Sequence, residues 1–435
     1  MNAMPDCPAL FIGASASHQG KTTVTAALAR HHARRGLKVR VFKTGPDFLD
    51  PMILERACGA PVYSLHLSMV GLEACRALLA QAAREADLIL IEGVMGLFDG
   101  TPSSADLAAA FDVPVLAVIG AHGMAQTFGA IAFGLARYRA DVPFHGVLAN
   151  RVASPRHAQM LSETIPEGLR YCGHLSNADD IALPERHLGL TQPDEVAGLD
   201  ARLDRAADAI AQTTLAALPP PVHFADATLP APPRLLEGLD IAIARDAAFS
   251  FVYPANIDLL VAMGARVRTF SPLADEPAPP EADALYLPGG YPELHAATLA
   301  ANARTRASIA HHVARGKAVV AECGGMLYLL DTLTDVEGTR HAMLGVLPGD
   351  AAMQRKLSRL AMQRIDTAHG AMTGHTFHYS TLDTPMQPAL SATHATTGAA
   401  GEALYRHGPV TATYMHAYWP SNPAAAAALF RGETL

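Results

Sequence analysis

The sequence predicts an α/β protein made of two doubly wound domains, each built on a parallel sheet. Continuous apolar segments, such as residues 88–91 and 113–119, have the length and composition of buried strands, and segments of helical character separate them. Apolar strands that alternate with helices are typical of parallel sheets covered on both faces. The alternation occurs twice, on either side of a proline-rich stretch, so we predict two domains.

Composition sets the domain limits. Prolines crowd residues 215–238, where little periodicity remains, and such a stretch is typical of a semi-rigid linker. We therefore predict one domain over residues 1–214, a linker over residues 215–238 and a second domain over residues 239–435. A chain of 435 residues is long enough for two domains with separate cores.

Charge and cysteine usage exclude several classes of protein. The 33 basic and 41 acidic side chains give a formal net charge of −8, which argues against a nucleic-acid or anionic-membrane surface. Five scattered cysteines without metal-ligand spacing fit a reducing cytoplasm. We expect no signal peptide, and no segment has the roughly 18 apolar residues of a membrane helix. The expected location is cytoplasmic, and nothing in the sequence indicates an oligomeric state.

A phosphate-binding loop is predicted between a strand over residues 9–12 and the helix that follows. It contains Gly20-Lys21-Thr22-Thr23, the second half of a P-loop motif, whereas Ser15 stands where the usual spacing places the first glycine. Backbone N–H groups would cradle phosphate, Lys21 would add a point charge and Thr22 would offer a hydroxyl to Mg²⁺. The alternative is an ordinary strand-to-helix turn.

Polar residues follow three further predicted strands. Asp47 and Asp50 come after the strand over residues 37–42, Glu92 ends the next strand, and Asn150 follows the strand over residues 146–149. Ligand-binding groups gather at the carboxyl ends of parallel strands, and carboxylates there suit a hard cation. For Asp50, a turn that caps the next helix is an equally good interpretation.

Cys323 indicates a second site in the C-terminal half. The strand over residues 317–321 leads into it, a helix starts near residue 326, and Ala321 and Gly325 are small enough for the sharp turn of a nucleophile elbow. The helix start is expected to lower the thiol pKa and favour the thiolate. The alternative is a buried structural cysteine.

A cysteine nucleophile requires a base. His416 has the best setting, because we expect the strand over residues 410–415 to deliver it into a loop. His375 and His378 are three residues apart, on opposite faces of a strand, so at most one would face a given site. The other candidates in this half are His369, His394 and His407.

Six motifs together resemble the cobyrinate a,c-diamide synthase family of cobalamin biosynthesis, which includes the hydrogenobyrinate enzyme. They occur in the family's order over nearly the whole chain. They are Gly20-Lys21-Thr22-Thr23, Lys43-Thr44-Gly45-Pro46-Asp47, Ile91-Glu92-Gly93-Val94-Met95-Gly96, residues 183–190, Leu287-Pro288-Gly289-Gly290-Tyr291-Pro292-Glu293 and Ala321-Glu322-Cys323-Gly324-Gly325.

The resemblance implies an N-terminal domain similar to dethiobiotin synthetase and a C-terminal domain similar to class I glutamine amidotransferases. Family members use ATP and Mg²⁺ to amidate the a and c carboxylates of the corrin ring through acyl phosphates, with glutamine as nitrogen donor. The implied partners are therefore a corrin polycarboxylate, glutamine and ATP.

In the second domain the resemblance implies a Cys-His pair rather than a full Cys-His-Glu triad, because Ala417 and Tyr418 stand where the triad would have its acid. The resemblance also implies roles for individual residues. The implied roles are ATP binding by Gly20, Lys21, Thr22, Thr23 and Asn150, metal binding by Thr22, Asp47 and Glu92, and substrate or phosphate contact by Lys43, Asp50 and Asp99. In the second domain they are nucleophile (Cys323), base (His416) and oxyanion hole (Gly290, Tyr291 and Gly324).

Two other functions are compatible with parts of the sequence. A partitioning-type nucleotide switch shares the first fold, but its signature lysine is replaced by Ala16, and such a protein would not need Cys323. An amidoligase acting on another tetrapyrrole, such as nickel-sirohydrochlorin, or one close to cobyric acid synthase, would use the same groups. No residue in the sequence distinguishes a cobalt-containing from a cobalt-free corrin.

Overall fold

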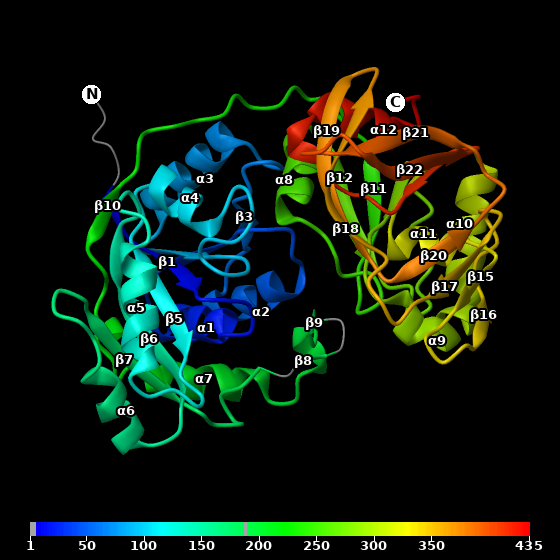
Figure 1. The fold of residues 1–435 in the computed structure, drawn as a ribbon. Coiled ribbons are helices and arrows are strands. Elements are labelled where there is room, and N and C mark those ends of the chain that lie inside the picture. Colours follow the sequence, from blue (N-terminus) through cyan, green and yellow to red (C-terminus); the bar gives the residue numbers. More distant parts are fainter. Residues whose placement is uncertain (1–5, 184, 187–188) are drawn as a thin grey trace. The chain divides into compact units, whose positions relative to one another are not determined.

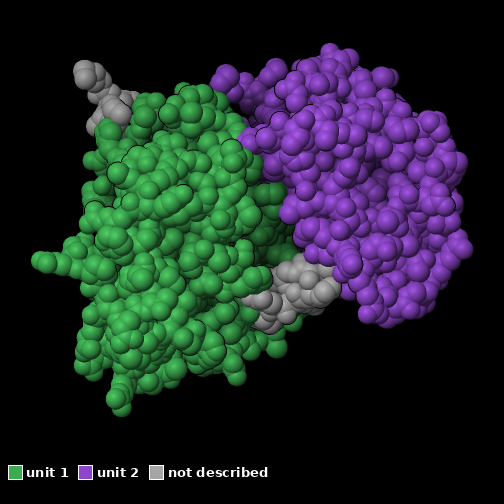
Figure 2. All heavy atoms as spheres, viewed as in Figure 1, with its two compact units in different colours: residues 1–67, 71–229 green, residues 68–70, 230–435 purple. Residues whose placement is uncertain are grey.

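The computed structural model describes residues 6–183, 185–186 and 189–435. By their contacts these residues divide into two compact units, coloured separately in Figure 2. Unit 1 comprises the described residues up to 67 and those from 71 to 229, and unit 2 comprises residues 68–70 and 230–435. The division falls within the proline-rich stretch. In the motif over residues 183–190, Pro184, His187 and Leu188 lie outside the described residues.

Unit 1 is built on a parallel sheet, as predicted (Figure 1). Only β10 (Pro221–His223) is antiparallel in the described part of this sheet; it pairs with β1 and brings part of the predicted linker into the unit. The parallel strands, in spatial order, are β3 (Tyr63–Ser64), β2 (Val39–Lys43), β4 (Leu88–Glu92), β1 (Asp6–Ala14), β5 (Val115–Gly120), β6 (Phe144–Val152) and β7 (Tyr171–Ser176).

Helices cover both faces of this sheet because successive residues of each buried strand point to opposite sides. Leu116 and Val118 pack with α1, α2 and α7, whereas Ala117 and Ile119 pack with α5 and α6. The helices of the unit are α1 (Lys21–Arg34), α2 (Leu49–Cys58), α3 (Leu72–Glu85), α4 (Ser104–Ala110), α5 (Thr127–Arg137), α6 (Pro155–Ser162) and α7 (Leu199–Ile210). The short strands β8 (Glu185–Arg186) and β9 (Gly189–Leu190) pair with each other.

Unit 2 contains a larger sheet that is parallel from β12 to β23 and antiparallel beyond it. The predicted parallel strands are therefore present, and antiparallel strands extend them. In spatial order the strands are β12 (Arg266–Phe270), β11 (Asp240–Ala244), β13 (Ala284–Leu287), β14 (Ala318–Glu322), β23 (Val410–Thr413), β22 (Ala400–His407), β21 (Pro388–His394), β18 (Arg359–Thr367), β19 (Gly370–His378) and β24 (His416–Tyr418). A smaller sheet consists of β16 (Arg340–Ala342), β15 (Thr332–Thr334), β17 (Asp350–Met353) and β20 (Ser380–Asp383).

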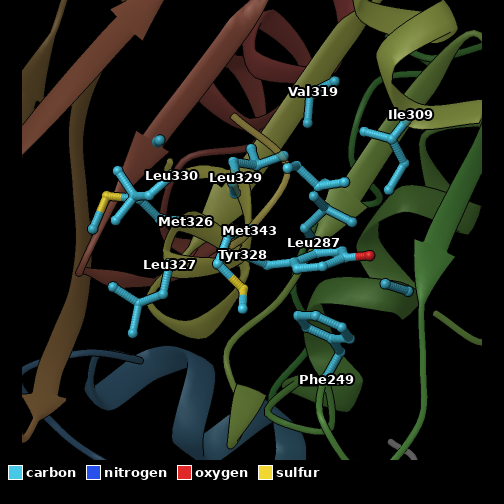
Figure 3. Packing of buried hydrophobic residues seen from close by; sticks show 14 of the residues in the cluster. Phe249, Leu287, Ile309, Val319, Met326, Leu327, Tyr328, Leu329, Leu330 and Met343 are labelled. Atoms are coloured by element: carbon cyan, nitrogen blue, oxygen red, sulfur yellow. The ribbon is translucent and has the colours of Figure 1, made fainter. Parts of the chain in front are cut away.

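The core of unit 2 also lies on both faces of its parallel strands. On one face Leu287 and Val319 pack against Ile309 and the aromatic rings of Phe249 and Tyr328 (Figure 3). The opposite face is covered by α8 and α12. The helices of the unit are α8 (Pro254–Ala262), α9 (Ala296–Ala301), α10 (Ala303–Ala314), α11 (Gly324–Leu329) and α12 (Pro423–Arg431). No helix in the described part of the chain is long and apolar enough to cross a membrane.

Candidate active sites

The loop between β1 and α1 is held in place by the ends of two neighbouring strands. Asn150, on β6, donates from Nδ2 to the Gln19 carbonyl oxygen at 2.9 Å, and the Gly120 N–H at the end of β5 donates to Gln19 Oε1 at 2.8 Å. Gly20 directly precedes α1 and has a φ of 89°, and a Cβ atom there would lie 2.1 Å from Asn150 Nδ2. Only glycine fits this position, because both its φ and the space around it exclude a side chain.

Lys21 lies at the start of α1, almost entirely buried. Its Nζ donates to the carbonyl oxygens of Met95 at 2.6 Å and of Ala16 at 3.3 Å. The ammonium group therefore connects the loop between β1 and α1, which contains Ala16, to the loop after β4, which contains Met95. Burial, reinforced by the nearby positive charge of Lys43, lowers the pKa of Lys21 to about 8. A phosphate bound beside it would favour the charged form. Thr23 follows in the first turn of the helix, half-buried.

A buried group of charges lies at the ends of β2 and β4, next to this loop. Lys43 Nζ lies 3.2 Å from Glu92 Oε1 and 3.3 Å from Asp50 Oδ2. Burial alone would lower the pKa of Lys43, but Glu92 and Asp50 together raise it above its ordinary value. Burial also favours a neutral Asp50, yet Lys43 outweighs this effect and lowers the pKa of Asp50. Lys43 and Asp50 therefore carry opposite charges.

Asp47, rather than Asp50, caps α2. Its Oδ1 accepts the backbone N–H groups of Leu49 at 2.8 Å and of Asp50 at 3.2 Å. Burial, reinforced by the negative charge of Asp50, raises the pKa of Asp47 well above its ordinary value. The proposed capping role thus belongs to Asp47, and Asp50 instead forms the ion pair with Lys43.

The donors beside Lys21 suit Mg²⁺. Thr22 donates from Oγ1 to Glu92 Oε1 at 3.1 Å, while Glu92 Oε2 is buried without a hydrogen-bond partner. Burial raises the pKa of Glu92 to about 7 even though Lys43 opposes the shift. The described residues contain no group of three or more His, Cys, Asp or Glu side chains that could hold a metal ion. Mg²⁺ typically binds one or two carboxylates together with substrate phosphates, so the groups present fit it.

Asp99 is exposed in the loop that follows β4. Its Oδ2 accepts the Gly96 N–H at 3.0 Å, and its charge favours the protonated form of Lys21. Asn150 holds the loop between β1 and α1 through its hydrogen bond to Gln19. Its predicted contact with adenine stays a prediction. In unit 1 the structure thus gathers Lys21, Thr22, Lys43, Asp50 and Glu92 into one group.

In unit 2, Cys323 stands on a strained turn between β14 and α11. Its φ of 44° is unusual for a residue with a side chain, and its N–H donates to the Thr413 carbonyl oxygen at 2.8 Å. A Cβ at Gly325 would lie 1.9 Å from the Leu287 carbonyl oxygen, which explains why a small residue is needed there. The turn has the geometry expected of a nucleophile elbow.

The Cys323 thiol is not activated by the helix start, contrary to the sequence-based expectation. Burial raises the pKa of Cys323 above its ordinary value, and the negative charge of Glu293 adds to the effect. The backbone N–H of Gly324 opposes the shift but is outweighed. A neighbouring base is therefore needed to remove the proton.

His416 is the first residue of β24, so the expectation that it lies in a loop is wrong. A Cβ at Gly289 would lie 2.3 Å from His416 Cε1, 3.1 Å from His416 Nδ1 and 3.4 Å from Cys323 Cβ. His416 and Cys323 therefore converge on Gly289. Burial, together with the nearby His378, lowers the pKa of His416 to about 3, which keeps the imidazole neutral.

Two of the predicted oxyanion-hole residues come together beside Cys323. A Cβ at Gly324 would lie 3.1 Å from the Gly290 backbone nitrogen. Gly290 has a φ of 157°, and a Cβ there would lie 2.1 Å from the Ala248 carbonyl oxygen. Tyr291 follows directly, with its ring 5.0 Å from that of Phe251. Backbone N–H groups thus border the turn that presents the thiol.

Sequence reasoning gave no role to two polar residues around this pair, Glu322 and Tyr253. Glu322 accepts the Tyr286 hydroxyl at 2.8 Å and the Ala417 N–H at 3.2 Å, and burial raises its pKa to about 8. Tyr253 and His375 lie in a chain of contacts that ends at His416. The contacts of Glu322 and Tyr253 join residues far apart in the sequence, so spacing gave no signal for these two.

His375 and His378 have different neighbours, as their spacing predicted. His375 contacts His416, whereas His378 Nε2 lies 3.2 Å from Glu402 Oε1 and its ring stacks on Tyr414 at a centroid distance of 3.8 Å.

Both units match known protein families. Residues 10–190 match the CobQ/CobB/MinD/ParA nucleotide binding domain, and residues 240–424 match the CobB/CobQ-like glutamine amidotransferase domain. These matches and the two sheets confirm the predicted fold class.

Three curated relatives match nearly the full length. The hydrogenobyrinate a,c-diamide synthase of Stutzerimonas stutzeri (strain A1501) is 58% identical over 98% of this chain and 99% of its own. The Pseudomonas aeruginosa protein of the same name is 57% identical over 97% of both chains. The cobyrinate a,c-diamide synthase of Herminiimonas arsenicoxydans is 54% identical over 98% of this chain and 97% of its own. The chain therefore belongs to the family of the hydrogenobyrinate and cobyrinate a,c-diamide synthases.

Proposed function

We propose that the protein is a glutamine-hydrolysing, ATP-dependent ligase of cobalamin biosynthesis that converts the a and c carboxylates of hydrogenobyrinic or cobyrinic acid to amides. One observation carries this proposal: the chain contains a phosphate loop in one unit and a Cys-His pair in the other. The same chain is 54–58% identical to synthases of both names. Each group supports one half of such a reaction.

The first half activates a carboxylate. A carboxylate is a poor electrophile, so the terminal phosphoryl group of ATP is transferred to it, giving an acyl phosphate and ADP. Lys21, anchored to the carbonyl oxygens of Met95 and Ala16, offsets the negative charge of the phosphates during the transfer. Asp50 and Asp99 border the substrate, and Lys43 holds Asp50 in place.

Thr22, Asp47 and Glu92 would hold Mg²⁺, which supplies charge neutralisation to the phosphate oxygens when bound. The buried Glu92 Oε2, which has no hydrogen-bond partner, supports this assignment. Asn150, which holds the loop through its hydrogen bond to the Gln19 carbonyl oxygen, is assigned the contact with adenine.

The second half releases ammonia. His416 takes the proton of the Cys323 thiol as sulfur attacks the glutamine amide carbon, and then gives it to the departing ammonia. Backbone N–H groups of Gly290, Tyr291 and Gly324 stabilise the oxyanion. Water cleaves the thioester to glutamate and restores the thiol. Ammonia displaces phosphate from the acyl phosphate and forms the amide.

The test separates the two halves with one substitution. Cys323→Ala is expected to abolish amidation with glutamine while leaving amidation with ammonium salts, ATP and Mg²⁺ intact. Incubation with each candidate tetrapyrrole, followed by mass spectrometry, counts the acid-to-amide conversions and identifies the substrate. A folded Cys323→Ala protein that is inactive with both nitrogen sources would contradict the proposal.

A further inference from the structure

His375 and His416 face each other across two strands. β19 and β24 are antiparallel neighbours in which His375 is paired directly with His416. The ring centroids are 5.0 Å apart with an interplanar angle of 17°, and each residue is 1% exposed. Directly opposed side chains in an antiparallel pair lie on the same side of the sheet, so strand register itself brings the two rings together.

Tyr253 holds His375 from the other side. The Tyr253 hydroxyl lies 2.9 Å from His375 Nδ1, and both residues are buried. Tyr253 directly precedes α8, whose Asn256 donates from Nδ2 to the Ala417 carbonyl oxygen at 2.8 Å and accepts the Trp419 N–H at 2.9 Å. The start of α8 therefore fixes both the ring of His375 and the backbone of β24.

The imidazole of His416 needs such support. The terminal torsion of a histidine side chain is soft, yet a general base must direct one ring nitrogen at the proton that it removes. Gly289 adjoins one edge of the ring, at Cε1 and Nδ1, and His375 lies parallel to its face. These neighbours limit the orientations open to the ring.

We propose that His375, fixed by the Tyr253 hydroxyl, is a positioning residue that orients His416 by ring stacking, in the role that an acidic residue has in a three-membered Cys-His-acid site. The inference rests on the proposed function, because it assigns His416 as the base of glutamine hydrolysis. His375 acts through His416 and need not contact glutamine. It should therefore affect kcat for glutamine hydrolysis and leave KM for glutamine unchanged.

The experiment measures glutamine hydrolysis and ammonia-dependent amidation in the same variants of the full chain. His375→Ala removes the ring and should lower kcat about ten- to hundredfold, the size of effect caused by a misplaced catalytic group. KM for glutamine and ammonia-dependent amidation should stay as in the wild type. Tyr253→Phe removes only the hydroxyl and should lower kcat by a smaller factor.

Replacing the His375 imidazole by a phenyl ring distinguishes two possible roles of His375, because a phenyl ring can stack on His416 but cannot transfer a proton. His375→Phe keeps the ring but leaves the Tyr253 hydroxyl unsatisfied, so His375→Phe combined with Tyr253→Phe is the matched rescue. The double variant should recover kcat to within about fivefold of the wild type, because replacing both partners of a hydrogen bond by apolar groups is nearly neutral.

His312→Asn is the control for loss of a buried histidine in the same unit. His312 Nε2 lies 3.1 Å from the Ala318 carbonyl oxygen, and its replacement should lower stability without changing kcat.

Three outcomes would each overturn the inference: a wild-type kcat in folded His375→Ala, a change in that variant confined to KM, or a double variant as slow as His375→Ala. If His375→Ala does not fold, the kcat values of Tyr253→Phe and of the double variant test the inference instead. A wild-type protein that hydrolyses glutamine but never forms an amide contradicts the proposed function alone.

Discussion

At the scale of single residues, Gly20 offers a test of the phosphate loop. Gly20→Ala places a Cβ 2.1 Å from Asn150 Nδ2 at a φ of 89°, so the loop must shift. Gly36→Ala is the matched control, because Gly36 has a similar φ of 83° and no atom lies within 4 Å of the added Cβ. Both variants should lose about 1 kcal/mol of stability from backbone strain, but only Gly20→Ala should weaken ATP binding, by about tenfold or more. Calorimetric titration with ATP checks this, and equal affinities would contradict the proposed role of the loop.

Gly289 provides the corresponding test in unit 2. A Cβ there would lie 2.3 Å from His416 Cε1, so Gly289→Ala should displace the imidazole from Cys323. Glutamine hydrolysis should fall about a hundredfold because the base is misplaced, while ammonia-dependent amidation should persist. Parallel assays with the two nitrogen sources measure the split. Unchanged glutamine hydrolysis would show that the imidazole does not need this position.

At the scale of elements, the strands and turns that carry functional groups were predictable from local sequence. Apolar runs mark β1, β4 and β14, and small residues mark the turn at Cys323 because a Cβ at Gly325 would meet the Leu287 carbonyl oxygen. The strand β24 was not predictable. It is three residues long, and its pairing with β19 joins residues about forty positions apart. The raised pKa of Cys323 was missed for a similar reason, because it depends on burial by distant segments and on Glu293.

Two helix ends contain buried histidines that should make stability depend on pH. His32 lies in the last turn of α1 and His312 in the last turn of α10, and each ring contacts a backbone carbonyl oxygen. Burial lowers the pKa of each from 6.5 to about 4. Between these values the unfolded chain binds more protons than the folded protein, so acid favours unfolding. Each histidine should cost about 2 kcal/mol of stability between pH 7 and pH 5.

Urea denaturation at the two pH values checks this, with circular dichroism reporting both units and the fluorescence of the single tryptophan, Trp419, reporting unit 2 alone. His32→Gln and His312→Gln should each reduce the loss of stability between pH 7 and pH 5. His311→Gln, at an exposed neighbouring position, should leave that loss unchanged. A pH dependence unchanged in the first two variants would rule out these histidines as its source.

At the scale of the whole molecule, the two sets of functional groups lie in units that have separate sheets and separate cores. Substitutions in one unit should therefore leave the chemistry of the other intact. Lys21→Ala is expected to abolish amidation with either nitrogen source while glutamine hydrolysis continues. This is the reverse of the pattern expected for Cys323→Ala, and the pair of variants allows a stronger test than either alone.

Lys21→Ala and Cys323→Ala should complement each other when mixed. The first variant retains Cys323 and His416 and releases ammonia from glutamine, and the second retains the phosphate loop and consumes ammonia, so the mixture contains both complete sets of groups. Glutamine-dependent amidation should appear after a lag in which free ammonia accumulates, and an enzyme that removes ammonia from solution should abolish it. Neither variant alone should form product from glutamine. If the mixture stays inactive after ammonia has accumulated, Lys21 and Cys323 do not act in separable reactions, and the assignment of one reaction to each unit fails.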